Sequence, residues 1–168
     1  MRSLIQAFIT LAFLITLGGS TFALQTEAGW ISDVYSRGDF RLAERANVAD
    51  IVVAAEDFKV VHIAAENLAA DVQRVTGKQP SLRSDGNNLR GHVIFADTLG
   101  KSSFVDSLVR NGKLDVAQLR GKWESFLITT VTNPMPGVSL GLVIVGSDRR
   151  GTAFGIFELS EAIGVSPW

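Results

Sequence analysis

The chain contains no cysteine in its 168 residues. Disulfide bonds, cysteine-based zinc sites and thiol nucleophiles are therefore excluded. Histidine is scarce as well, because His62 and His92 are the only two. One of them falls in a helical pattern and the other at the start of a strand pattern, and this spacing does not fit a metal site. We therefore expect neither a metal ion nor any other cofactor.

An excess of charge of one sign is also lacking. Sixteen Lys and Arg against 17 Asp and Glu give a formal net charge of −1, and only Arg149 and Arg150 are adjacent basic residues. This balance excludes the basic surface that nucleic-acid binding requires. Hydrophobic residues make up 46% of the chain and charged residues 20%, which is typical of a globular domain rather than a disordered tail.

The amino terminus carries the one long apolar run. Arg2 precedes an uncharged apolar stretch over residues 4–17, and the small residues of 18–23 follow. This layout predicts a secretory signal peptide over residues 1–23 and a secreted mature domain over 24–168. An uncleaved membrane anchor is the alternative, although the run is shorter than the ~20 residues that a transmembrane helix needs.

Hydrophobic periodicity predicts alternating strands and helices in the mature chain. Strands are expected over residues 40–44, 51–55, 80–83, 92–96, 123–131 and 140–145. Helices are expected over 102–110, over 149–163, and as one turn from Asp115 through Leu119. The alternation predicts the α/β class, as a two-layer sandwich with a mixed sheet and helices. The last two strands lie close enough along the chain to form an antiparallel hairpin.

A further helix has the clearest pattern. Apolar residues recur at spacings of three and four on one face, at Val61, Ala65, Leu68, Val72 and Val75. Asp57 is the expected N-cap and Gly77 the expected stop.

The most informative local motif is GSDRRG at residues 146–151, between the most hydrophobic strand and the last helix. One interpretation is an anion site formed by Ser147, Arg149 and Arg150, because free N–H groups at a helix start attract negative charge. The alternative is a helix start capped by Ser147 or Asp148, with arginines that pair with acids or face another domain. The spacing fits neither a P-loop nor a dinucleotide fingerprint.

The remaining polar residues suggest no catalytic group. Glu158 and Glu161 would be neighbours on the last helix, and an exposed acidic face explains them without catalysis. The serines at 102, 103 and 107 have no nucleophile-elbow context. Trp123, at a strand start, is expected to pack in the core or between domains. Close packing of the helix against the sheet would explain Gly151 and Gly155.

The end of the chain, VIVGSDRRGTAFGIFELSEAIGVSPW over residues 143–168, resembles the N-terminal module of glycoside hydrolase family 115, the xylan α-glucuronidases. Three earlier pieces resemble the same module in the same order: residues 64–77, 111–115 and 121–126. A shorter form of the closing motif resembles the equivalent domain of β-hexosaminidases. The resemblance thus implies a hexosaminidase domain 2-like α/β sandwich over residues 24–168.

The resemblance also implies what the chain does not carry. The family's catalytic carboxylates and glucuronate-binding residues belong to a barrel that follows the module, so the resemblance assigns no catalytic residue here. It implies a non-catalytic domain of a secreted enzyme that hydrolyses (4-O-methyl)glucuronic acid side chains of xylan. The barrel of the same polypeptide would be the partner, with Ser147, Arg149, Arg150 and Trp168 at its rim. The alternatives are a stand-alone carbohydrate-binding module and an inactive fragment.

Overall fold

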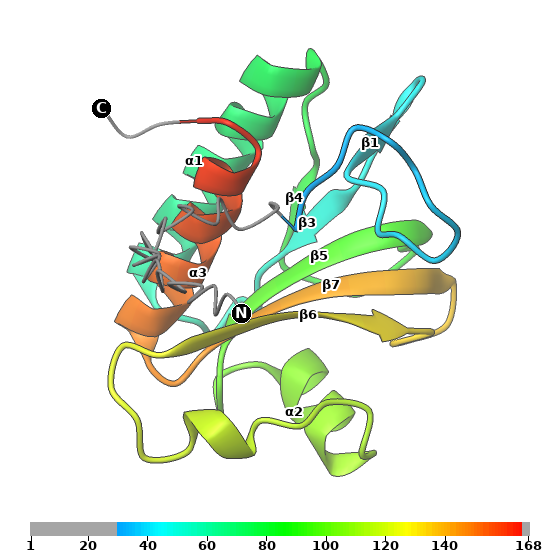
Figure 1. Ribbon diagram of the computed structural model, residues 1–168. Helices are drawn as coiled ribbons and strands as arrows, with labels where there is room; N and C mark the ends of the chain where they lie inside the picture. The colour runs from blue at the N-terminus through cyan, green and yellow to red at the C-terminus, as the bar shows by residue number, and fades with distance from the viewer. Residues whose placement is uncertain (1–29, 166–168) are drawn as a thin grey trace, which may run out of the picture.

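The computed structural model of the protein describes residues 30–165 (Figure 1). The predicted signal peptide, residues 1–23, and Trp168 lie outside the described residues. The strands are β1 (Ala43–Glu44), β2 (Asn47–Val48), β3 (Asp50–Val52), β4 (Leu82–Arg83), β5 (Gly91–Thr98), β6 (Phe126–Thr132) and β7 (Val138–Gly146). The helices are α1 (Lys59–Thr76), α2 (Ser103–Arg110), the 3₁₀ turn η1 (Ala117–Leu119) and α3 (Arg149–Ala162).

The main sheet has five strands in the order β4-β3-β5-β7-β6. Strands β4, β3, β5 and β7 run parallel, and β6 pairs antiparallel with β7. The predicted α/β class, the mixed sheet and the closing hairpin are therefore confirmed. The strand expected over residues 40–44 differs, because β1 pairs only with β2 in a separate two-stranded sheet.

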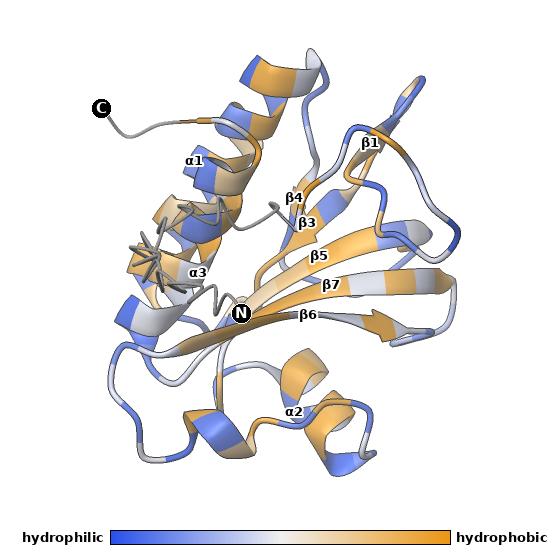
Figure 2. Cartoon of the chain, viewed as in Figure 1, coloured by the Kyte–Doolittle hydropathy of each residue, from blue (hydrophilic) through white to orange (hydrophobic). Residues whose placement is uncertain are grey.

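Helices cover both faces of the main sheet, so the predicted two layers become three. Helices α1 and α3 lie side by side on one face, while α2 and η1 lie on the other (Figure 1). The β3–α1–β4 connection runs toward one edge of the sheet, whereas the chain after β5 passes through α2 and η1 to β6 at the opposite edge. Helices α1 and α2, which follow these two central strands, pack on opposite faces of the sheet. Hydrophobic residues accordingly line β5 and β7, which are buried on both sides (Figure 2).

Helix α1 follows its predicted apolar face, with two differences. Gly77 ends the helix in the left-handed conformation (φ 72°), and its N–H donates to the carbonyl of Gln73, as expected of a C-terminal glycine. Val75, at the frayed end of the apolar face, is exposed rather than buried. The residue at the N-cap is Phe58, not Asp57, and it makes no side-chain cap. Within residues 30–165, no helix is both long and apolar enough to cross a membrane.

Candidate functional site

The GSDRRG motif forms the turn between β7 and α3, where Asp148 caps the helix. Its Oδ1 accepts hydrogen bonds from the N–H groups of Arg150 and Gly151, both at 2.9 Å. Its Oδ2 accepts from the N–H of Glu124 at 2.8 Å. The hydrogen bond from Glu124 is the largest of the contributions that lower the pKa of this carboxyl. Of the two caps predicted for α3, Asp148 is therefore the one that forms.

Ser147 fastens the same turn to the segment that enters β6. Its Oγ accepts from the N–H of Ser125 at 3.1 Å, and its own N–H donates to the Ser125 carbonyl at 2.8 Å. The Ser147 hydroxyl is thus hydrogen-bonded to the backbone of the segment that enters β6.

The two adjacent arginines diverge. Arg150 forms an ion pair with Glu124, 2.9 Å between Nη1 and Oε1, and its guanidinium lies 5.8 Å from the centre of the Phe154 ring. Arg149 lies 5.9 Å from the centre of the Phe58 ring, on the side of the loop after β3. The N–H groups of Arg150 and Gly151 already have an anionic partner in Asp148. The geometry therefore agrees with the interpretation of a capped helix start. The N–H groups of Arg150 and Gly151 are not free to bind an anion. The anion site stays a prediction.

Glycine allows the motif to pack this closely. A Cβ at Gly151 would collide with the carbonyl of Ser125, and one at Gly155 would stand 2.8 Å from Ile144 Cγ2. The predicted reason for Gly151 and Gly155, close packing of the last helix against the sheet, is confirmed.

A buried polar cluster occupies the carboxyl ends of β3 and β5. The side chain of Asp97 is fully buried, and its oxygens accept from the N–H of Ala54 at 2.7 Å and the hydroxyl of Ser102 at 2.8 Å. Burial raises the pKa of Asp97 to about 6. Asp57 accepts from the N–H of Thr98, which explains why it does not cap α1.

This cluster lies where ligands usually bind in parallel sheets, since the connections of β3 and β5 diverge there. Both oxygens of Asp97 have internal partners, however, and the hydroxyls of Thr98 and Thr152 pair with each other at 2.8 Å. The cluster therefore joins the loops to one another rather than presenting a reactive group. The sequence analysis did not predict this polar cluster. The one local indication was the Asp-Thr pair that follows the apolar run of residues 93–96.

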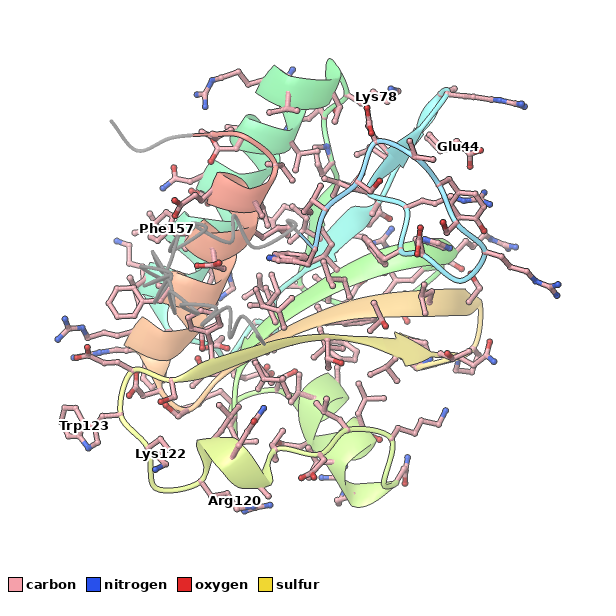
Figure 3. All side chains as sticks on the ribbon, viewed as in Figure 1. Glu44, Lys78, Arg120, Lys122, Trp123 and Phe157 are labelled. Carbon is pink, nitrogen blue, oxygen red and sulfur yellow. The ribbon has the colours of Figure 1, made fainter. Side chains whose placement is uncertain are left out.

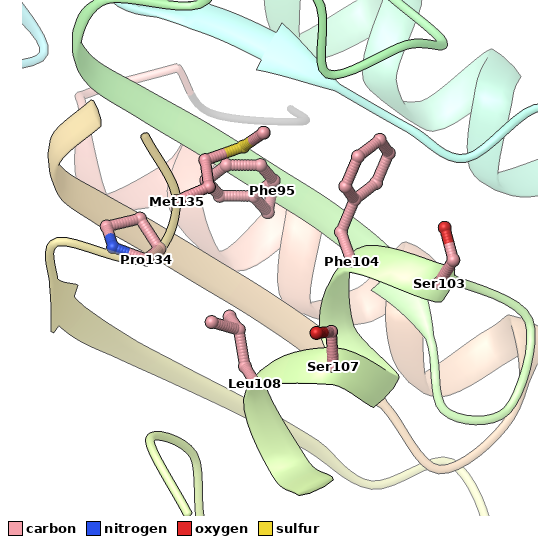
Figure 4. Close-up of a pocket in the computed structure, with 7 residues that line it drawn as sticks. All are labelled: Phe95, Ser103, Phe104, Ser107, Leu108, Pro134 and Met135. Carbon is pink, nitrogen blue, oxygen red and sulfur yellow. The ribbon is translucent and has the colours of Figure 1, made fainter. Parts of the chain in front are cut away.

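A small cavity of about 210 Å³ opens between α2 and the turn after β6 (Figure 4). It is lined by Phe95, Ser103, Phe104, Ser107, Leu108, Pro134 and Met135. It is smaller than the roughly 300–1,000 Å³ of small-molecule sites. No lining residue is ionisable, so the cavity can hold an apolar group but cannot perform acid–base chemistry.

The other predicted groups do not form a reactive centre in the part of the chain that the structure describes. Residues 30–165 contain no cluster of three potential metal ligands. Glu158 and Glu161 are both exposed on α3. Trp123 is 84% exposed and contributes nothing to the core, so the expectation of core packing was wrong. Packing against another domain remains a prediction.

The outer sides of α1 and α3 expose apolar residues. Phe154 and Phe157 on α3 are 42% and 47% exposed, and Val60 and Ile63 on α1 are exposed to a similar degree. Figure 3 shows Phe157 projecting from α3 away from the sheet. We call these four residues the outer helical face.

Comparison with known proteins gives an informative match among the solved structures. No protein-family model and no curated protein matches the chain. A solved structure described as "A novel family GH115 4-O-Methyl-alpha-glucuronidase, BtGH115A, with specificity for decorated arabinogalactans" matches at 27% identity with a TM-score of 0.56. The match covers 71% of this chain and 14% of that one, so the chain spans a small part of the length of that protein. In fold and sequence, the chain is similar to part of a GH115 4-O-methyl-α-glucuronidase.

Proposed function

We propose that the chain is a non-catalytic accessory domain of a secreted GH115-type α-glucuronidase. The parent enzyme would hydrolyse (4-O-methyl)glucuronic acid side chains from xylan. The observation that carries this proposal is the match between most of the chain and a small part of a much longer glucuronidase. The N-terminal position of the domain rests on the resemblance of the closing motif over residues 143–168.

The carboxylates of the described residues support the absence of catalysis. Glycoside hydrolysis needs two carboxyl groups that face one scissile bond across a cleft. The buried Asp97 has internal partners on both oxygens, and Asp148 is engaged by three backbone N–H groups. Glu158 and Glu161 are exposed on a helix and line none of the four best-formed cavities among residues 30–165.

The outer helical face supports the proposed partner, which is the catalytic barrel of the same polypeptide. Large exposed apolar patches often mark surfaces that bind another protein or domain. Phe154 and Phe157 lie on the helix that resembles the family's closing motif, and α1 packs beside it. A barrel docked on this face would bury all four side chains.

Activity assays on the purified chain and on the longer polypeptide encoded by its gene test the proposal. The chain alone should release no 4-O-methylglucuronic acid from glucuronoxylan, whereas the longer polypeptide should release it. A glucuronidated arabinogalactan forms a second substrate arm, because the matched solved structure is described with that specificity. Release by the isolated chain would overturn the non-catalytic assignment, and a gene that encodes nothing beyond Trp168 would remove the proposed barrel.

Secretion is tested separately by the intact mass of the protein recovered from the culture medium. We expect a mature chain that begins near residue 24, since the signal-peptide pattern ends there. A recovered chain that still begins at Met1 would refute cleavage.

A further inference from the structure

The loop between η1 and β6 is held in a fixed conformation. The N–H of Lys122 donates to the carbonyl of Leu119, and the hydroxyl of Ser125 donates to the carbonyl of Trp123 at 3.0 Å. Glu124 adopts a left-handed conformation (φ 53°), which a non-glycine residue adopts only when its surroundings impose it. Asp148 imposes it here by accepting the N–H of Glu124. We call residues 119–125 the Trp123 loop.

The fixed loop displays a large aromatic ring to solvent. Trp123 is 84% exposed, the highest fraction among the large hydrophobic side chains of residues 30–165. Figure 3 shows its side chain projecting away from the sheet. Because the backbone on both sides is anchored, a ligand that binds the indole does not have to order the loop first.

Exposed cationic residues lie in the same loop as this ring. Arg120 and Lys122 project from the same loop (Figure 3) and are exposed. Arg150 is held beside the loop by its ion pair with Glu124. Three cations (Arg120, Lys122 and Arg150) and two carboxylates (Glu124 and Asp148) thus lie in or against the loop, whereas the chain as a whole has a formal net charge of −1. Such a local field favours an anionic ligand.

We propose that the Trp123 loop binds a saccharide that carries a uronic acid, with the sugar ring stacked on the Trp123 indole and the carboxylate near Lys122 and Arg120. The choice of a uronic acid rests on the proposed function, which supplies a glucuronic-acid-decorated polysaccharide as the surrounding substrate. The loop would hold the accessory domain on this polysaccharide, in addition to whatever site the parent enzyme uses for hydrolysis.

The composition of the loop distinguishes a saccharide from a docked protein surface. The buried centres of protein interfaces are depleted in lysine and gather several apolar side chains. The outer helical face has that apolar character, with Phe154 and Phe157 on one helix. The Trp123 loop instead offers one flat ring among exposed cations, and the planar guanidinium of Arg120 suits recognition of a carboxylate.

Isothermal titration calorimetry of the purified chain tests the proposal, with two probes that differ only in the 4-O-methylglucuronic acid substituent. One is xylotriose substituted with 4-O-methylglucuronic acid, and the other is unsubstituted xylotriose. We expect the acidic probe to bind, with an affinity that falls as salt is raised. Trp123→Ala should weaken binding by about tenfold or more, since it removes the stacking surface. Lys122→Ala should weaken binding of the acidic probe and leave the neutral probe unaffected.

Phe157→Ala is the matched control, because it removes an exposed aromatic ring outside the loop and should bind the acidic probe as the unmodified chain does. Absence of binding at about 10 mM probe, equal affinity for both probes, or unchanged affinity after Trp123→Ala would each overturn the proposal. Circular dichroism spectra of the variants establish that they are folded. The titration measures binding and needs no catalytic activity. Its result on the saccharide site is therefore independent of the hydrolysis assays on the longer polypeptide.

Discussion

The carboxylate of Asp148 holds the N–H of Glu124 at 2.8 Å while it caps α3 with its other oxygen. One side chain therefore fixes both the start of the last helix and the loop that enters β6. This explains why an acid, rather than a simple serine cap, stands at this position of the GSDRRG motif. Mutation of Asp148 tests the two roles together.

Replacing Asp148 with Ala should lower the free energy of unfolding by about 1–2 kcal/mol, because the helix cap and the anchor of the loop are both lost. Asp148→Asn should lower the free energy of unfolding by less than Asp148→Ala does, since the amide oxygen can still accept one hydrogen bond. Urea denaturation at neutral pH measures both. Glu158→Ala, which removes an exposed acid from the same helix, should change the free energy little. A loss for Glu158→Ala equal to that for Asp148→Ala would refute the two roles.

Gly155→Ala should destabilise the protein even though alanine favours helices. The new Cβ would lie 2.8 Å from Ile144 Cγ2 and 3.1 Å from the ring of Phe126. Overpacking of this kind typically costs about 1–3 kcal/mol, which exceeds the roughly 1 kcal/mol gained in helix propensity. Thermal unfolding gives the comparison, with Glu161→Ala on the exposed side as the control. A higher melting temperature for Gly155→Ala would contradict the close packing.

The hydroxyls of Thr98 and Thr152 should be energetically coupled. They lie 2.8 Å apart and both residues are buried. Thr152→Val leaves the buried Thr98 hydroxyl without this partner, at a cost of about 1–3 kcal/mol. Thr98→Val should cost less, because the Thr152 hydroxyl keeps its hydrogen bond to the Asp148 carbonyl. The double substitution should cost less than the sum of the two single changes. Urea denaturation of the unmodified chain and the three variants gives a double-mutant cycle. Strict additivity of the changes in the free energy of unfolding would show that the two hydroxyls are not coupled.

Asp97 should make stability depend on pH in the range where few other groups titrate. Burial raises its pKa from 3.8 to about 6 in the folded state, so the folded chain binds this proton more tightly than the unfolded chain. The contribution of Asp97 is therefore most favourable below about pH 4 and is lost as pH rises through about 6, a change on the order of 3 kcal/mol.

The test compares the unmodified chain with Asp97→Asn by urea denaturation between about pH 4 and pH 7. The amide oxygen can accept from the N–H of Ala54, and the amide nitrogen can donate to Oγ of Ser102. The amide has no proton to lose, so the variant should lack the decline seen in the unmodified chain. Measurements stay above about pH 4 because the pKa of Asp148 is lowered, and its contribution is lost in the opposite direction at more acidic pH. Parallel pH profiles for the two proteins would show that Asp97 is not responsible.

Elements with strong local signals were predictable from the sequence. The stop of α1 at Gly77 and the capped start of α3 after Asp148 agree with the structure, because glycine and N-cap chemistry act within one turn. The hairpin of β6 and β7 was also predictable, since a short connection leaves few other arrangements. These features depend on neighbours along the chain.

What escaped prediction depends on contacts between distant segments. Asp57 was expected to cap α1 and instead binds the N–H of Thr98, at the end of a strand far along the chain. The third layer follows from the order of the strands, which periodicity does not determine. Trp123 is exposed in a loop that the hydrogen bond between Asp148 and Glu124 ties to the start of α3. A hydrophobic residue next to a strand gives no local indication of this outcome.

The place of β7 in the sheet has a consequence for how the chain is made. This strand comes late in the sequence, yet it lies between β5 and β6. Within the described residues, β6 pairs with no strand other than β7. A ribosome must therefore synthesise almost the entire domain before the sheet can close, so this domain should remain unfolded while most of its own residues are translated. That delay suits the proposed export, since a chain that has not yet folded can still be threaded through a translocation channel.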